Sequence, residues 1–175
     1  MPTQTYLGNP NLKAKGVPVN FDKEHVKEYI KCSKNPVYFA KNYVKIINVD
    51  KGLVPFKLYK FQKEMVETFN ANRFSICKLP RQSGKSTTVT AYILWLILFK
   101  DSQNIAILAN KGSLARDLLG KIQFAYEYLP KWLQQGIVVW NKGNIELENS
   151  SKVVAAATSS SAIRGGSYNL IFLDE

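Results

Sequence analysis

The sequence contains few of the residues that catalyse reactions or bind metals through imidazole and thiolate groups. It has one histidine, His25, and two cysteines, Cys32 and Cys77. A single histidine leaves almost no material for Ser-His-Asp, Cys-His or histidine-based zinc chemistry. The cysteines form no metal-binding pattern, and we expect Cys77 to be a buried thiol in an apolar strand. A reducing compartment is therefore the default expectation.

Long apolar runs are also missing. The longest continuous one, Ala91 to Phe99, is far shorter than the ~20 residues that a membrane-spanning helix needs. Residues 1–20 show no apolar segment of the signal-peptide type. Glycine and proline recur in these residues, so we expect an irregular N-terminal arm.

The chain is instead rich in apolar residues and in positive charge. Its 175 residues are 46% hydrophobic, which suits a globular domain with a real core. Lysine and arginine number 24 against 13 acidic residues, and the net charge of +11 is spread along the chain. This excess favours a polyanionic partner, either nucleic acid or a membrane surface, although general solubility would explain it too.

Hydrophobic periodicity predicts alternating helices and strands. We expect helices over residues 22–31, 36–43, 58–69, 84–99 and 113–128, strands over 74–78, 104–109, 152–157 and 169–173, and hairpins within 46–55 and 137–148. Right-handed β-α-β crossovers then imply an α/β fold with a mostly parallel sheet flanked by helices.

The segment Leu79–Thr87 joins the strand expected at 74–78 to the following helix. Its Gly84-Lys85-Ser86 is the ending of the phosphate-binding P-loop, G-x-x-x-x-G-K-[ST], with Leu79 in place of the first glycine. Unpaired backbone N–H groups at the start of the helix can bind a phosphate, and Gly84 permits close approach. Lys85 would contact the β- and γ-phosphates of ATP, and Ser86 would bind Mg²⁺.

Two further segments suit the same site. Asp174-Glu175 follows an apolar strand, as in a Walker B motif, so Asp174 can hold Mg²⁺ and Glu175 can deprotonate the attacking water. Phe61-Gln62 precedes the loop by about 20 residues, as in the Q-motif of helicase-like ATPases. The amide of Gln62 can pair with adenine and an aromatic ring can stack on the base.

Taken together, the motifs resemble the large terminase subunit of tailed bacteriophages, in which an Arg-Gln pair precedes x-Gly-Lys-[Ser/Thr]. Here that pair is Arg81-Gln82. The resemblance covers roughly residues 7–175. Further segments carry it: Leu58–Gln62, Ala109–Ser113, Leu129–Ile137, Trp140–Leu147, Ala162–Ser167 and Leu170–Glu175. Of these, 129–137 and 140–147 are similar to the T-even-like branch.

The resemblance implies a P-loop ATPase fold of the RecA/ASCE type and an ATP-driven motor that packages viral DNA into a prohead. It implies a nucleotide site built from Phe61, Gln62, Arg81, Gln82, Ser83, Gly84, Lys85, Ser86 and Thr87, with Ser86 and Asp174 on Mg²⁺ and Glu175 as the catalytic carboxylate.

Two arginines also have roles by resemblance. Arg81 would act on the γ-phosphate in its own subunit, and Arg164 would be a finger offered to a neighbouring subunit in a ring. A planar guanidinium suits the charge that phosphoryl transfer builds on the γ-oxygens. The alternative for Arg164 is a loop arginine that binds DNA or nothing.

The implied partners are double-stranded viral DNA, the portal protein, the small terminase subunit and copies of the chain in a pentamer-like ring, without a membrane. The implied location is the host-cell cytoplasm, transiently docked on the portal of the prohead.

The sequence stops at Glu175, directly after an apolar strand, so we expect a part of a longer protein. A complete large terminase continues into a coupling motif and a nuclease domain, and we expect endonuclease activity only there. The expected organisation is an arm over 1–20, a helical N-terminal subdomain over 21–57 and a partial ATPase domain over 58–175, truncated at Walker B. An apolar sheet edge should then be exposed.

Two other functions remain open. A helicase-type ATPase shares the Q-motif, the P-loop and the Asp-Glu pair, but the Arg81-Gln82 pair and the hairpin at Trp140 argue against it. A non-enzymatic, basic nucleic-acid-binding module would need a degenerate loop, although Leu79 is the one position of the nucleotide motifs that departs from the pattern.

Overall fold

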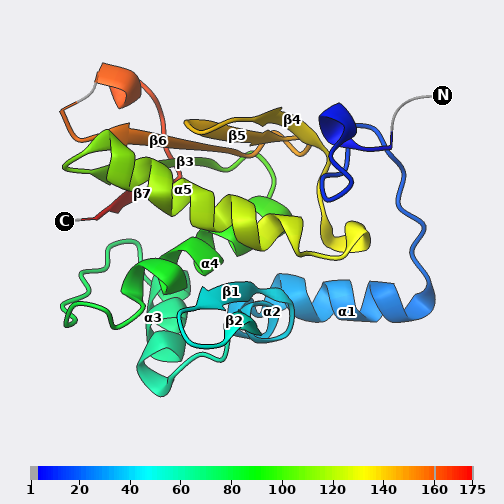
Figure 1. The fold of residues 1–175 in the computed structure, drawn as a ribbon, viewed down its shortest axis with the longest axis horizontal. Coiled ribbons are helices and arrows are strands. Elements are labelled where there is room, and N and C mark those ends of the chain that lie inside the picture. The colour runs from blue at the N-terminus through cyan, green and yellow to red at the C-terminus, as the bar shows by residue number, and fades with distance from the viewer. Residues whose placement is uncertain (1–3, 160, 175) are drawn as a thin grey trace.

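The helices and strands of the chain form layers in a computed structural model that describes residues 4–159 and 161–174. The main sheet forms one layer, α5 (Gly112–Glu127) packs on it, and α4 (Lys85–Phe99) packs on α5 (Figure 1). Two N-terminal helices, α2 (Pro36–Tyr43) and α3 (Lys60–Ala71), pack against α4 from the other side. No helix in the described part of the chain combines the length and the apolar content needed to cross a membrane.

The main sheet has five strands in the order β4-β5-β6-β3-β7. Their bounds are β3 (Asn104–Ala109), β4 (Ile137–Trp140), β5 (Asn144–Leu147), β6 (Lys152–Ala157) and β7 (Leu170–Leu173). β3 pairs in parallel with both β6 and β7, whereas β4, β5 and β6 pair antiparallel in sequence. The α/β prediction is therefore confirmed, but the sheet is mixed because the hairpin β4–β5 extends it on one side.

The strand predicted over residues 74–78 is wrong. The segment is irregular, and Phe74 and Ile76 are 83% and 99% exposed. β7 is an edge strand of the described sheet, and residues 74–78 do not pair with it. Without a neighbouring strand, the backbone groups of 74–78 have no hydrogen-bond partners that would hold them in a strand. The buried thiol predicted at Cys77 is accordingly exposed.

The sheet edge formed by β7 is partly apolar and uncovered among the described residues. Ile171 and Leu173 are 51% and 68% exposed. Their neighbours on the strand, Leu170 and Phe172, are half-buried and pack on the core. The exposed apolar edge expected from the sequence is therefore confirmed.

α4 lies at the centre of the core. Its sequence is apolar on nearly every face, as expected for a helix packed between α5 on one side and α2 and α3 on the other. The Trp95 side chain is 2% exposed, and its indole N–H donates to the Cys32 carbonyl at 2.8 Å. This bond joins α4 to α1 (Lys23–Lys34).

The N-terminal helices begin where their cap residues predict. Asp22 accepts the backbone N–H of His25 at 2.7 Å and starts α1, and Asn35 accepts that of Tyr38 at 2.9 Å and starts α2. The predicted hairpin in 46–55 is present as β1 (Lys45–Asn48) and β2 (Gly52–Pro55).

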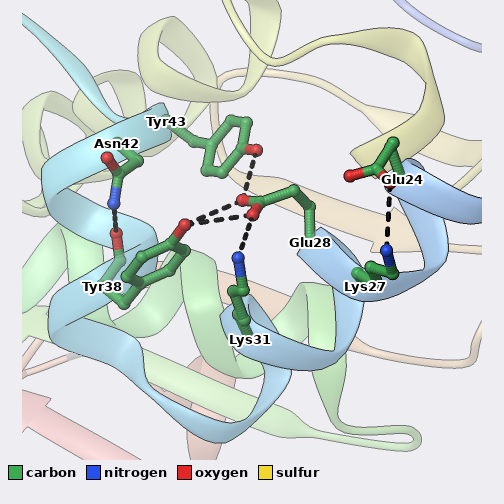
Figure 2. A network of polar contacts seen from close by, with 7 residues as sticks. All are labelled: Glu24, Lys27, Glu28, Lys31, Tyr38, Asn42 and Tyr43. Atoms are coloured by element: carbon green, nitrogen blue, oxygen red, sulfur yellow. Dashed lines mark hydrogen bonds and ion pairs between the residues drawn. The ribbon is translucent and has the colours of Figure 1, made fainter.

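A polar network joins α1 to α2, and Figure 2 shows it around the Glu28 carboxylate. Glu28 accepts hydrogen bonds from the hydroxyls of Tyr38 at 2.9 Å and Tyr43 at 3.1 Å, and from Lys31 Nζ at 2.8 Å. The hydrogen bond from Lys31, followed by that from Tyr38, holds the pKa of Glu28 below its ordinary value. Burial and the hydrogen bond to Glu28 raise the pKa of Tyr43.

The N-terminal arm lies along the β4 side of the sheet rather than away from it. Ala14 forms a parallel bridge with Ile137, and the Lys13 carbonyl accepts the Ile137 N–H at 2.9 Å. Gln134, which is 3% exposed, accepts the Lys13 N–H at 3.0 Å through its side chain. Leu12 is buried in the core, so the arm is part of the packed structure. Its 3₁₀ turn, Tyr6–Gly8, precedes these contacts.

Candidate nucleotide-binding site

The loop before α4 has the backbone geometry of an anion site. Gly84 is the N-cap of α4 with φ of 77°, a left-handed conformation that suits glycine, and the helix begins at Lys85. The first intrahelical N–H bond belongs to Thr88, which donates to the Gly84 carbonyl at 2.9 Å. The N–H groups of Lys85, Ser86 and Thr87 precede that bond, so they point out of the helix end toward any anion placed there.

The side chains of this loop also suit a polar ligand. Ser83 has a buried hydroxyl that finds no hydrogen-bond partner among residues 4–159 and 161–174, which is an unusual arrangement for a polar atom. Ser86 and Thr87 are half-buried in the first turn of the helix, whereas Arg81 and Gln82 are exposed. The residues present therefore fit a bound phosphate group, and Ser86 supplies the hydroxyl oxygen that a magnesium ion prefers.

Gln62 lies beneath this loop in the first turn of α3. It is 3% exposed, its Oε1 accepts the Tyr59 N–H at 2.9 Å and its Nε2 donates to the Ser83 carbonyl at 3.3 Å. Phe61, its neighbour, is half-buried and stacks on the Tyr59 ring with centroids 5.9 Å apart. The sequence predicts Gln62 as a nucleotide-binding residue but does not reveal its bond to the loop. The spacing Tyr59-x-x-Gln62 is similar to that of a capping box, so the sequence could have indicated the bond between the Tyr59 N–H and Gln62.

Asp174 lies at the carboxyl ends of the parallel strands. Its N–H donates to the Leu108 carbonyl of β3 at 2.8 Å, and the N–H of Thr158, after β6, donates to the Ala109 carbonyl at 2.9 Å. Ligands of open α/β sheets bind at this edge. Figure 1 shows that the end of β7 and the loop before α4 lie on the same side of the molecule. Glu175 lies outside the described residues.

The predicted metal ligands, Ser86 and Asp174, form no acidic cluster. Among residues 4–159 and 161–174, no three His, Cys, Asp or Glu side chains come together as a metal site would require. A magnesium ion at this edge would therefore depend on Asp174, the Ser86 hydroxyl and oxygens from phosphate and water, which is how magnesium commonly binds beside nucleotides.

The turn that precedes Arg164 lies apart from the loop before α4 (Figure 1). Arg164 is exposed and follows the 3₁₀ turn Ser161–Ile163, where its N–H donates to the Ser161 carbonyl at 3.0 Å. In Figure 1 this turn lies above the sheet, whereas the loop before α4 lies below α5. The structure thus brings together Gln62, Ser83 and Gly84, but not Arg164.

The sheet, its flanking helices and the loop at the head of α4 define an α/β protein whose fold matches part of a large terminase. The chain is similar to the crystal structure of the HK97 bacteriophage large terminase, with a TM-score of 0.66 and 18% identity over 82% of this chain and 31% of that one.

Sequence comparison identifies the family. A model of the T4likevirus-type terminase large subunit, N-terminal region, matches residues 76–175, so the chain belongs to the terminase large subunit family. The chain is also 25% identical over 126 residues to tripartite terminase subunit 3 of human herpesvirus 8 type P (isolate GK18). This match covers 69% of the chain but only 18% of that relative's length, so the chain corresponds to a small part of it.

Proposed function

We propose that this chain binds and hydrolyses ATP within a motor that packages viral DNA into a prohead. The observation that carries the proposal is the head of α4, where Gly84 turns the backbone and the buried Ser83 hydroxyl has no partner in the described part of the chain. Such a site suits an anion, and family membership favours a P-loop NTPase of the RecA/ASCE type that uses ATP. Residues 58–175 would form this part, with 21–57 as its helical subdomain and 1–20 as an arm.

Within the proposed site, Lys85 and the N–H groups that follow Gly84 bind the β- and γ-phosphates. Arg81, Gln82 and Thr87 complete the phosphate contacts, and Phe61 lies on the side of α3 proposed for the base. Bound Mg²⁺ would neutralise charge on the phosphate oxygens. Ser86 and Asp174 would hold that ion, and Asp174 lies at the sheet edge where the parallel strands end.

The catalytic groups of the proposal are one carboxylate and two guanidinium groups. Glu175 orients and deprotonates the attacking water. Arg81 acts within its own subunit. Arg164 acts on the nucleotide of a neighbouring subunit. Its exposure, and the distance of the preceding turn from the loop before α4 (Figure 1), support a role between subunits. A ring of copies, double-stranded DNA, the small terminase subunit and the portal on which the motor docks are the proposed partners.

The test is a hydrolysis assay on the full-length protein that carries this chain, with and without double-stranded DNA. We expect Glu175→Gln to abolish ATP hydrolysis while ATP still binds, because the change removes a base and leaves the phosphate contacts. Loss of binding in that variant would instead make Glu175 structural. Strand separation of duplex DNA without translocation into proheads would favour the helicase-type alternative.

A further inference from the structure

The amide of Gln62 holds two backbone segments at once. Its oxygen binds the N–H of Tyr59 at the start of α3, and its nitrogen binds the carbonyl of Ser83, 21 residues later in the chain. Because only 3% of the residue is exposed, the amide has little access to solvent or to a base. Gln62 therefore links the first turn of α3 to the loop that opens α4.

The contact fixes the orientation of one peptide group. The Ser83–Gly84 peptide bond is trans. In a trans peptide the C=O and N–H groups point in opposite directions, so a Ser83 carbonyl aimed at Gln62 directs the Gly84 N–H away from Gln62. The approach is close, since a Cβ on Gly84 would lie 2.7 Å from Gln62 Nε2. Glycine is thus needed both for the φ of 77° and for the space that the amide occupies.

We propose that Gln62 is a positioning residue of the nucleotide site, which holds the Ser83–Gly84 peptide so that the Gly84 N–H stays available to a phosphate. This role rests on the proposed function. Without the Gln62 donor the part-buried Ser83 carbonyl loses its partner, and the peptide is free to rotate. A rotated peptide would turn a carbonyl oxygen toward the anion. The effect acts through the loop, so it does not depend on the base of the nucleotide.

The experiment measures binding of ATP, GTP and inorganic tripolyphosphate, each with Mg²⁺, by calorimetry on the full-length protein. Gln62→Met removes both bonds without adding charge. Gln62→Glu keeps an acceptor for the Tyr59 N–H, and with it the helix cap, but removes the donor to Ser83. Lys63→Gln makes the same change of charge at the neighbouring exposed position and measures the effect of charge alone. Thermal unfolding of each variant sets a temperature at which all are folded.

We expect Gln62→Met to weaken all three ligands by the same factor, about tenfold, the size of one lost hydrogen bond. Gln62→Glu should also weaken the binding of all three ligands, and by a larger factor than Lys63→Gln does. In both Gln62 variants the ratio of ATP to GTP affinity should stay unchanged. Loss of ATP affinity alone would overturn the proposal and make Gln62 a base-reading residue. Unchanged binding of all three ligands would overturn it too. Failure of the unaltered protein to bind ATP would contradict the proposed function itself.

Discussion

Replacing Glu148 by glutamine should release the N-terminal arm from the sheet. The Glu148 carboxylate accepts the N–H of Gly136 at 2.5 Å through one oxygen and that of Gly16 at 2.9 Å through the other, and Lys13 Nζ lies 3.1 Å away. An amide has one acceptor oxygen, so it would keep one of these bonds and place its NH₂ group against the other N–H. Lys13, whose side chain is only 7% exposed, would also lose its counter-charge.

These losses set the expected magnitude. A hydrogen bond to a charged group contributes about 1.5–3 kcal/mol, and breaking a buried ion pair costs about as much or more. Because the arm can open without the rest of the chain unfolding, we expect a local loss of about 3 kcal/mol. That corresponds to roughly a hundredfold faster hydrogen exchange at the amides of Lys13 and Gly16, measured by exchange NMR.

A matched control lies two residues earlier, within β5. Glu146 pairs with Lys152 at 3.1 Å on a more exposed surface, so Glu146→Gln should change arm exchange little, because exposed pairs contribute about 0–1 kcal/mol. Equal exchange rates in the Glu148→Gln and Glu146→Gln variants would refute the reasoning, since they would mean that the bonds to Gly16 and Gly136 contribute nothing.

The same contact predicts the response of the arm to acid. Burial alone would raise the pKa of Glu148, but the N–H groups of Gly16 and Gly136 and the Lys13 ammonium together lower it. A carboxyl with a lowered folded-state pKa stabilises the fold fully above its unfolded-state pKa, and the stabilisation is lost as pH falls through the folded-state pKa. Protection of the arm amides, corrected for the intrinsic exchange rate at each pH, should therefore fall as pH drops through and below the ordinary titration range of glutamate, and this step should be absent in Glu148→Gln.

Two further substitutions test the core and the loop. Gly84→Ala should lower the free energy of unfolding in urea by about 1–2 kcal/mol more than Gly165→Ala does. Both positions have φ of 77°, but only at Gly84 would the new Cβ meet Gln62 Nε2. Equal losses would contradict the contact. Trp95→Phe should cost about 2–3 kcal/mol in the same assay, because it removes the bond to the Cys32 carbonyl and leaves a space in the core; a loss under 1 kcal/mol would contradict that account.

Local patterns in the sequence predicted most of the elements. Asp22 and Asn35 marked the starts of α1 and α2, because a cap side chain acts on backbone groups only three residues away. The apolar runs at 104–109 and 152–157 predicted β3 and β6 with their observed bounds. β3 is buried along nearly its whole length, as expected for a continuous apolar run, whereas β6 is only partly buried. The start of α4 followed in the same way from Gly84 and Lys85.

Contacts between distant segments could not be read in this way. The apolar run at 74–78 has the composition of a strand, but pairing depends on a neighbour, and its side chains are exposed here. The bond from Gln62 to Ser83 and the bond from Gly16 to Glu148, 132 residues apart, depend on how whole elements pack. No local period in the sequence encodes such pairings.

The most direct test of the central claim is ATP binding to Lys85→Ala in the full-length protein, with Lys100→Ala as the control. Lys85 is the first residue of α4 and Lys100 is its C-cap, so the two changes remove the same charge from opposite ends of one helix. We expect Lys85→Ala to weaken ATP binding about 10- to 100-fold, the loss of one charged contact, and Lys100→Ala to leave it unchanged. Equal affinity in both variants and the unaltered protein would contradict a phosphate site at the head of α4.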